Sequence, residues 1–226
     1  MNGTHPDTDA ARPLATSRAP LAEAARALLG PGVAVAGGRV ADWALPLLPG
    51  EAAAVARAVP HRRAEFAAGR ASARAAMAAL GLAPTPLPRR PDGPPLWPDG
   101  VAGSITHGGG HVLAAVARTG DGLDSLGLDL EPFTPLPADL AALVCRPDED
   151  ESQAIRVFGA KEAAYKAQFA LTGRILDFGA LRVTLQADGG FLATFTQGAG
   201  RFGRGCSIAG RQALVGALLV SAARIR

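Results

Sequence analysis

The chain has 226 residues, of which 48% are hydrophobic and 19% are charged, and its formal net charge is +3. This composition is ordinary for a globular protein and excludes a disordered chain, while the length allows one large domain or two small ones. The positive balance suits an anionic partner, and nucleic acid, a phosphate-bearing ligand and an acidic protein all remain open.

Three features of the chain bear on its compartment. Residues 1–20 are rich in Pro, Asp and Thr and lack an apolar stretch, so we expect a flexible N-terminus rather than a signal peptide. The apolar run 213–220 is shorter than the roughly 20 residues that a membrane helix needs. Cys145 and Cys206 are too few for a disulfide framework or a cysteine-based zinc site. The sequence therefore predicts a cytoplasmic protein without a membrane partner.

The first elements are three helices and one strand. The spacing of apolar residues and breakers predicts helices over 21–29, 51–58 and 61–80 and a strand over 33–36. Gly81 stands where the last of these helices needs a C-terminal cap.

Two stripes run along the 61–80 helix. The apolar stripe is expected to face the core and consists of Phe66, Ala73, Met77 and Leu80. Another side carries four arginines, Arg62, Arg63, Arg70 and Arg74. The ordinary interpretation of such a basic stripe is a solvated helix face.

The rest of the chain is rich in strands. Residues 84–98 are dense in proline and predict an ordered loop or a linker. The elements expected after it are strands over 101–107, 111–117 and 126–131, a helix over about 147–171, and strands over 181–186, 191–196 and 213–220. Helices precede strands in both halves of the chain, which allows two small α/β lobes that meet near residue 117.

Asp129 and Glu131 are two residues apart in a predicted strand, so both carboxylates point to one face. Because Leu128 and Leu130 alternate inward, the two acids should face water or a cleft. Converging carboxylates repel unless a cation lies between them, and Mg²⁺ held by carboxylates and phosphate oxygens fits that need. An exposed strand edge with two solvated acids remains the alternative.

Lysine is scarce in this chain, and its position is informative. Of 23 lysine and arginine residues only Lys161 and Lys166 are lysine, and they flank Glu162. A lysine is a compact charge that can give up its proton, whereas arginine stays charged. The ordinary interpretation of Glu162 and Lys166, four residues apart on a helix, is a surface ion pair worth about 0.3–0.5 kcal/mol. The scarcity of lysine and the small alanines around the pair, which would let a bulky group approach, favour a functional role.

The segment His107-Gly108-Gly109-Gly110 resembles the oxyanion-hole motif of some esterases. No histidine follows His111, so no catalytic triad can be completed in the order that those enzymes require. A zinc site of His107 and His111 also fails, because the glycines disfavour a helix and no third ligand is near. A structural histidine at a strand end remains the ordinary interpretation of His107.

Five blocks, in this order and at this spacing, resemble the Sfp/EntD-type 4′-phosphopantetheinyl transferases. They lie at residues 62–74 (RRAEF, GR and a further arginine), 93–100 (GPPLWPDG), 103–107 (GSITH), 127–132 (GLDLEP) and 160–166 (AKEAAYK). Each block alone is a weak signal, whereas five in register are specific. The resemblance covers about residues 60–180.

The resemblance implies transfer of the phosphopantetheine arm of coenzyme A to a serine of an apo acyl or peptidyl carrier protein, with release of adenosine 3′,5′-bisphosphate. It also implies an α+β fold, a pseudo-dimer of two similar α/β lobes over 21–117 and 118–226, with coenzyme A in the cleft between them. The expected enzyme is a monomer whose positive charge suits an acidic carrier protein. Such enzymes would serve siderophore, polyketide or nonribosomal peptide biosynthesis.

The same resemblance implies roles for individual residues. Asp129, Glu131 and Glu162 would hold Mg²⁺, or Mn²⁺ in its place, on the coenzyme A pyrophosphate. Glu162 would also be the base for the incoming serine, directly or through water. Lys166 would contact the phosphates and assist the leaving group, and Lys161 would add positive charge beside it. The remaining contacts to coenzyme A would come from Arg62, Arg70, Arg89, Arg90, Ser104, Thr106 and His107.

Two alternatives stay open. A non-enzymatic basic module that binds nucleic acid would explain the pI near 9.4 and the arginines. It would not explain three acids arranged for a metal, and an aromatic content of 5% leaves few platforms for base stacking, so we expect no nucleic-acid partner. The other alternative is a catalytically inactive relative that binds coenzyme A, against which the intact acids and both lysines argue.

Overall fold

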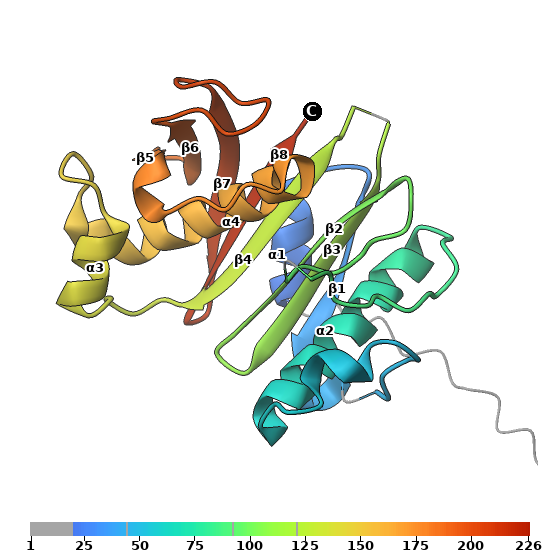
Figure 1. The fold of residues 1–226 in the computed structure, drawn as a ribbon. Coiled ribbons are helices and arrows are strands. Elements are labelled where there is room, and N and C mark those ends of the chain that lie inside the picture. The colour runs from blue at the N-terminus through green and yellow to red at the C-terminus, as the bar shows by residue number, and fades with distance from the viewer. Residues whose placement is uncertain (1–19, 44, 92, 121) are drawn as a thin grey trace, which may run out of the picture.

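A computed structural model describes residues 20–43, 45–91, 93–120 and 122–226 of the chain (Figure 1). The segment predicted to be flexible, 1–20, lies outside the described residues except for Pro20, which begins the first helix. The helices are α1 (Pro20–Leu29), η1 (Val40–Trp43), η2 (Ala52–Val55), α2 (Pro60–Ala79), α3 (Ala138–Val144), η3 (Glu151–Gln153), α4 (Ala154–Thr172) and η4 (Phe178–Ala180), where η marks a 3₁₀ helix. The strands are β1 (Val33–Arg39), β2 (Val101–Gly108), β3 (His111–Arg118), β4 (Ser125–Pro132), β5 (Leu181–Leu185), β6 (Gly190–Phe195), β7 (Ser207–Val215) and β8 (Leu218–Ile225).

The strands form two antiparallel sheets. The first has the order β1-β3-β2 and is covered by α2, and the second has the order β4-β8-β7-β6-β5 and is covered by α4. In chain order, the first strand of each sheet precedes the long helix that covers the sheet, β1 before α2 and β4 before α4. That strand pairs with the strand of its sheet that comes last in the chain, β1 with β3 and β4 with β8. The predicted α+β fold is confirmed. Its description as a pseudo-dimer with lobes over 21–117 and 118–226 stays a prediction.

Helix α1 joins the two sheets. It packs against β1 of the first sheet and against β7 and β8 of the second. Its apolar face, with Leu21, Ala25 and Leu29, lies in one core cluster with side chains of both sheets. Figure 1 shows α2 and α4 on opposite sides of the molecule, with β2 and β4 between them. The middle of the molecule is therefore a seam between two strands of different sheets.

Close backbone approaches define this seam. The amide of Leu128 in β4 donates to the Ser104 hydroxyl in β2 over 3.0 Å. A Cβ atom at Gly108 would lie 2.1 Å from the Leu130 carbonyl oxygen, and one at Gly127 would lie 1.9 Å from the Ala163 carbonyl oxygen. Glycine at these positions therefore lets β4 fit between β2 on one side and α4 on the other.

The alanines of α4 serve the same close packing. The small residues of this helix are fully buried, namely Ala160, Ala163, Ala164 and Ala167. We expected small residues here to let a bulky group approach the helix. Strand β4 of the same chain approaches Ala163 and Ala167 at Gly127, and all four alanines lie in the core cluster under α4, so these residues serve packing within the chain.

Three predicted elements differ from the structure, and the first is the helix expected over 51–58, which is only the short 3₁₀ turn η2 (Ala52–Val55). The helix expected over 147–171 begins at Ala154, because the Asp150 carboxylate accepts from the Ser152 amide and caps the separate turn η3. The strand expected over 213–220 is the β7–β8 hairpin, which turns at Gly216 with a φ of +60°. A continuous apolar run hid this turn. No helix in the described part of the chain is long and apolar enough to cross a membrane.

Candidate functional site

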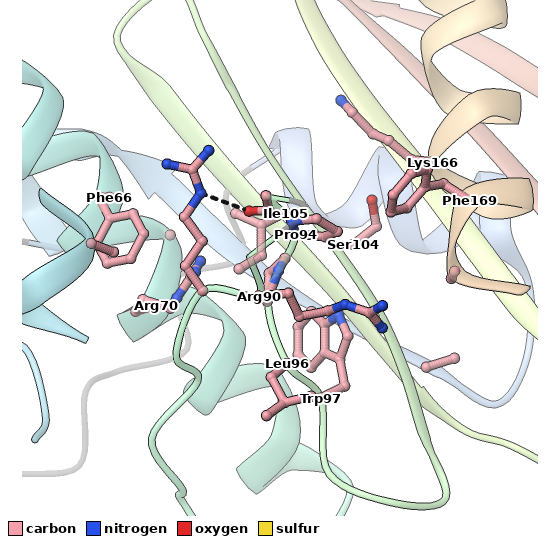
Figure 2. Close-up of a pocket in the computed structure, with 18 of the residues that line it drawn as sticks. Phe66, Arg70, Arg90, Pro94, Leu96, Trp97, Ser104, Ile105, Lys166 and Phe169 are labelled. Carbon is pink, nitrogen blue, oxygen red and sulfur yellow. Dashed lines mark hydrogen bonds between the residues drawn. The ribbon is translucent and has the colours of Figure 1, made fainter. Parts of the chain in front are cut away.

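A cleft of about 990 Å³ opens between α2, the proline-rich loop, β2 and α4. Figure 2 shows Arg70 and Arg90 on one side of it and Lys166 on the other. Eight of the predicted site residues line this cleft: Arg62, Arg70, Arg89, Arg90, Ser104, His107, Glu162 and Lys166. The structure thus brings together residues that lie more than a hundred positions apart in the chain, such as Arg62 and Lys166.

The arginine side of the cleft is built on α2. Arg70 is only 5% exposed, donates through Nε to the Leu87 carbonyl over 2.6 Å, and stacks on the Phe66 ring at 4.1 Å. Burial lowers the pKa of Arg70 to about 10. Phe66 was expected in the core, but it lines the cleft instead. The arginine stripe is therefore no ordinary solvated face, because Arg70 is held inside the protein.

A buried carboxylate holds the start of the proline-rich loop. Glu51 is fully buried and accepts from Arg74 over 2.8 Å and from the amides of Leu48 and Leu87, each over 2.8 Å. Leu87 is thereby fixed through its amide by Glu51 and through its carbonyl by Arg70. This network of α2 with the segments before and after it sets the position of Arg70. Sequence reasoning missed Glu51, which precedes a short helix and has no motif around it.

The proline-rich segment is an ordered loop that forms one wall of the cleft. Its turn is closed by a bond from the Arg90 amide to the Pro94 carbonyl over 2.8 Å. The Trp97 indole then lies directly on β2, where a Cβ at Gly103 would be 2.4 Å from the ring. A glycine in the GSITH block is therefore required for the loop to fold against the strand.

His107 lies at the end of β2 and faces α2. Its Nε2 accepts from the Arg62 guanidinium, and its Nδ1 is 3.7 Å from a Glu65 carboxylate oxygen. Burial lowers the pKa of His107, while Glu65 raises it and Arg62 lowers it further. A neutral imidazole that accepts from Arg62 agrees with that balance. The residue links β2 to the arginine side of the cleft.

Asp129 lies behind the cleft rather than in it. It is 3% exposed, and its Oδ1 accepts from Lys166 over 2.5 Å and from the Thr106 hydroxyl over 3.4 Å. The expectation that Asp129 faces water or a cleft is wrong, because β2 and α4 cover both faces of β4. Its other oxygen, Oδ2, is buried without a hydrogen-bond partner. A buried carboxylate oxygen normally accepts a hydrogen bond or binds a cation, so Oδ2 can still take such a partner.

The three predicted acids are close enough in space that the charge of Asp129 raises the pKa of the other two, Glu131 and Glu162. Burial raises the pKa of Glu131 to about 7, helped by Asp129 and Glu162 and opposed by Lys166. Burial also raises the pKa of Glu162, with Lys166 lowering it and Asp129 raising it. Among the described residues, no group of three or more His, Cys, Asp or Glu side chains is gathered tightly enough to hold a metal. The Lys166 ammonium neutralises Asp129 in this arrangement, yet the donor set, all carboxylate oxygens with one unpartnered, fits a hard divalent cation.

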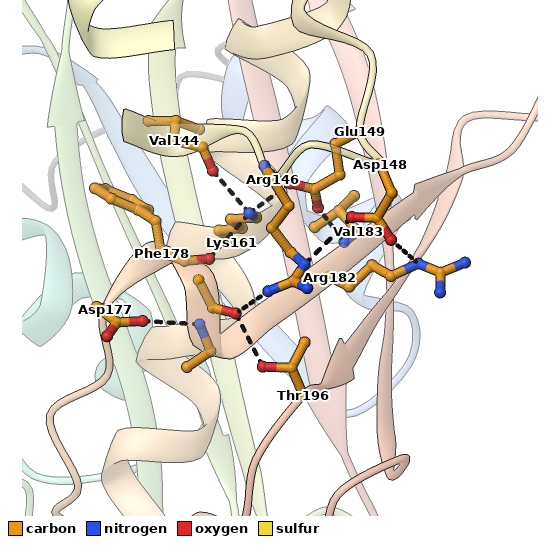
Figure 3. Close-up of polar contacts among 12 residues, drawn as sticks. Val144, Arg146, Asp148, Glu149, Lys161, Asp177, Phe178, Arg182, Val183 and Thr196 are labelled. Carbon is orange, nitrogen blue, oxygen red and sulfur yellow. Dashed lines mark hydrogen bonds and ion pairs between the residues drawn. The ribbon is translucent and has the colours of Figure 1, made fainter. Parts of the chain in front are cut away.

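Four of the predicted site residues do not line the cleft, namely Thr106, Asp129, Glu131 and Lys161, and Lys161 is held elsewhere by its own ion pair. Its side chain is 2% exposed, and Nζ donates to the Val144 carbonyl, the Glu149 carboxylate and the Phe178 carbonyl over 2.7, 2.7 and 3.0 Å (Figure 3). Burial lowers the pKa of Lys161, and the bond to Glu149 opposes that shift. All three N–H donors of the ammonium are used away from Lys166, so this geometry does not support a phosphate contact by Lys161.

A second cavity of about 410 Å³ adjoins the cleft and was not predicted. The two share Glu162 and Tyr165 in their linings. The other residues around the second cavity are mainly apolar: Leu143, Lys161, Leu176, Asp177, Phe178 and Leu181. Helix α4 therefore presents Glu162 at the junction of a basic cleft and a smaller, more apolar cavity.

Comparisons with protein families and with known proteins show what this chain is similar to. The 4′-phosphopantetheinyl transferase N-terminal domain model matches residues 50–117, and the 4′-phosphopantetheinyl transferase superfamily model matches residues 125–209. The 4′-phosphopantetheinyl transferase Npt of Nocardia iowensis is 38% identical over 151 residues, which are 63% of this chain and 68% of the relative. The chain belongs to the 4′-phosphopantetheinyl transferase family. The predicted resemblance is confirmed.

Two further members of the 4′-phosphopantetheinyl transferase family are similar. Svp of Streptomyces mobaraensis is 48% identical over 162 residues, 66% of this chain and 64% of Svp. PptT of Mycobacterium tuberculosis is 39% identical over 151 residues, 62% of this chain and 66% of PptT. The chain thus matches just under two thirds of the length of these two transferases. One family match ends at residue 117 in β3 and the other begins at residue 125 in β4, so the cleft takes residues from both matched parts.

Proposed function

We propose that this protein transfers the 4′-phosphopantetheine arm of coenzyme A to a serine hydroxyl of an apo acyl or peptidyl carrier protein. Adenosine 3′,5′-bisphosphate is the other product. The observation that carries the proposal is one cleft with the buried Arg70 on one side and Glu162 and Lys166 on the other, where Lys166 pairs with Asp129 behind the cleft, in a chain of the transferase family. Membership of the family and the position of these charges support the same reaction.

The arginine side of the cleft suits the nucleotide end of coenzyme A. Arg62, Arg70, Arg89 and Arg90 offer guanidinium groups to the 3′-phosphate, and arginine binds phosphate in a bidentate way. The same wall contains apolar and aromatic groups on which an adenine can lie, namely Phe66, Trp97 and Ile105. Ser104 and His107 lie between this wall and α4, where a phosphate can accept from the Ser104 hydroxyl and from the Arg62 guanidinium that contacts His107.

The acidic side suits the pyrophosphate with a divalent cation. Asp129, Glu131 and Glu162 would hold Mg²⁺, or Mn²⁺, and the unpartnered Oδ2 of Asp129 with the raised pKa of Glu131 and Glu162 supports that role. When bound, such a cation neutralises charge on the phosphate oxygens. Lys166 then faces the cleft as a compact positive charge beside the leaving group.

Glu162 is the base in this proposal. It takes the proton of the serine hydroxyl, directly or through one water, while the serine oxygen forms a bond to the phosphorus that carries the pantetheine. The bond from that phosphorus to the bridging oxygen of the pyrophosphate breaks, and the electron pair leaves with adenosine 3′,5′-bisphosphate. Burial raises the pKa of Glu162, and a more basic carboxylate accepts a proton more readily.

The pantetheine arm fits the second cavity. That cavity begins at Glu162 and Tyr165, where the cleft ends, and its lining is mainly apolar. A chain of methylene and amide groups gains by leaving water for such a lining. The nucleotide and the arm would then lie on either side of Glu162, with the reacting phosphorus beside it.

The decisive experiment is incubation of the full chain with coenzyme A, Mg²⁺ and an apo carrier protein, followed by mass spectrometry of the carrier. We expect a gain of one phosphopantetheine, lost when Glu162→Gln replaces the wild type and when the metal is chelated. An unmodified carrier in all reactions contradicts the proposal. A salt titration with random DNA tests the alternative of a nucleic-acid module, for which tight and steeply salt-dependent binding is the expected result. A monomeric, cytoplasmic enzyme with lobes over 21–117 and 118–226 completes the proposal.

A further inference from the structure

The pair of Lys161 and Glu149 is a fully enclosed ionic network below the second cavity. The two side chains are 2% and 1% exposed, and their charged atoms are 2.7 Å apart. Glu149 also accepts from the amides of Arg146 and Val183, while Lys161 reaches the carbonyls of Val144 and Phe178. Every donor of the ammonium and both oxygens of the carboxylate are therefore used inside the protein.

This network ties together five segments around the second cavity. Figure 3 shows the Lys161 ammonium at the centre, with bonds to the end of α3, to the 145–150 loop and to η4. Glu149 extends the connection to β5 through the Val183 amide. Phe178 and Leu181, which lie in or directly after η4, form part of the cavity wall. The position of that wall relative to α4 therefore depends on one lysine and one glutamate together with the bonds that Arg146 and Thr196 make to the Gly179 carbonyl.

We infer that Lys161 is a positioning residue that, with Glu149, holds the wall of the second cavity and thereby sets the binding of the pantetheine arm. This inference rests on the proposed function, because the ligand of the cavity is the arm of coenzyme A. It differs from a direct role in phosphate binding, since the lysine has no donor left for a phosphate. Glu149 lines neither cavity, so its influence on a ligand can only pass through the residues that it holds.

Lys161 is also the residue directly before Glu162. The backbone of α4 at this point is fixed on the buried side by the lysine and on the strand side by close contact with β4. A lysine that anchors the helix to the 145–150 loop and η4 thus sets both the cavity wall and the base at its entrance. Removal of the ammonium leaves the Phe178 carbonyl without this donor, so that η4 is then held through Gly179 and Ala180, by Arg146 and Thr196.

The test compares coenzyme A with adenosine 3′,5′-bisphosphate, which lacks the pantetheine arm. Adenosine 3′,5′-bisphosphate fills the basic cleft alone, whereas coenzyme A fills both spaces. For Lys161→Met we expect the Kd of coenzyme A to rise roughly tenfold to a hundredfold, as for other losses of ligand positioning. The Kd of adenosine 3′,5′-bisphosphate should stay unchanged. Isothermal titration calorimetry on the full chain measures both constants, and circular dichroism checks that each variant is folded.

Two further variants keep the test decisive. Glu149→Asp retains the charge but withdraws the carboxylate by one methylene, so it should weaken coenzyme A selectively and by less, even if Lys161→Met does not fold. Arg182→Met is the matched control, because it removes a positive charge from the same region but pairs only with the exposed Asp148 at 3.4 Å. It should bind both ligands like the wild type.

The remaining outcomes overturn the inference. Equal weakening of both ligands in a folded Lys161→Met protein would mean that the lysine contacts a phosphate. Unchanged binding of coenzyme A in both Lys161→Met and Glu149→Asp would mean that the network does not position the cavity wall. These failures leave the proposed function intact as long as the wild type binds coenzyme A and modifies a carrier protein, whereas a wild type that does neither removes the proposed function itself.

Discussion

The two lysines of α4 have opposite surroundings. Lys166 is 27% exposed, lines the cleft and pairs with Asp129, whereas Lys161 is 2% exposed and pairs with Glu149 below the second cavity. The two lysines are five positions apart on one helix, yet one lines the cleft in which we propose the reaction and the other is held in a buried network outside it. The scarcity of lysine thus points to two residues with specific contacts. The helix face on which each lysine lies decides whether it lines the cleft or pairs inside the protein.

A parallel difference separates the arginines of α2. Arg70 turns its guanidinium over Phe66 at the cleft, while Arg74, one turn further on, is held by the buried Glu51. Glu51 and Glu149 play similar parts, since each accepts two backbone amides and one cation and fixes a loop at the edge of a cavity. In both halves a charged side chain near a cavity is thus paired with a buried carboxylate that lines neither cavity.

Loss of the framework lysine should have the largest effect on stability. Lys161→Met leaves Glu149 buried without its cation, and removal of one partner of a buried pair costs about 3–5 kcal/mol. The free energy of unfolding in urea measures this loss. Arg182→Met, whose pair is exposed, should lose less than about 1 kcal/mol. Equal losses in the two variants would end the distinction between the two kinds of ion pair.

Lys166→Arg should have the next largest effect, and on rate rather than stability. The Lys166 ammonium donates to the Leu128 carbonyl over 3.2 Å and to the Asp129 carboxylate over 2.5 Å. A planar guanidinium does not reproduce this compact geometry. We expect kcat for carrier modification to fall on the order of 100-fold, or about 2.7 kcal/mol in activation free energy, with a melting temperature close to that of the wild type. Near wild-type turnover would show that any cation serves at this position.

The sequence predicted the charges of the site better than their placement. Asp129, Glu162 and Lys166 follow from a strand alternation and a helical i, i+4 spacing, both of which are local. Lys161 and Lys166 are five residues apart, which turns a helix by about 140° and puts them on different faces. That signal was available in the sequence for Lys161. The partner Glu149 was not predictable, because the helix expected over 147–171 would have placed it inside α4.

The fold was predicted where the signals were local and missed where tertiary packing decides. The antiparallel strands over 101–118 follow from alternation and from a glycine turn. In contrast, the burial of Asp129 on β4 depends on the close fit of β4 between α4 and β2, which rests on Gly108 and Gly127. Alternation along one strand cannot reveal that both of its faces are covered.

Gly127→Ala should have an intermediate effect that reaches both faces of α4. The added methyl group would meet the Ala163 carbonyl oxygen, so the helix and the strand must separate. Overpacking of this kind costs about 1–3 kcal/mol. Because Lys161 and Lys166 move together with the helix, activity and coenzyme A binding should fall in parallel, measured by carrier modification and calorimetry. Loss of one without the other would show that the two faces of α4 are independent.

Thr106→Val should have the smallest effect of the series. Its hydroxyl lies 3.4 Å from the Asp129 carboxylate, at the long end of a hydrogen bond, whereas the Lys166 ammonium lies at 2.5 Å from the same oxygen. A weak neutral bond beside a strong ionic one contributes less than about 1 kcal/mol, so we expect kcat to change by a few-fold at most.

The neighbouring hydroxyl provides the contrast. Ser104→Ala leaves the buried Leu128 amide without its acceptor and should cost about 1–3 kcal/mol of stability through the β2–β4 seam. If Thr106→Val instead abolishes turnover, the charge of Asp129 is set by the hydroxyl of β2 rather than by Lys166. Thr106 on β2 would then belong, with the Lys166 face of α4, to the groups that the proposed reaction needs.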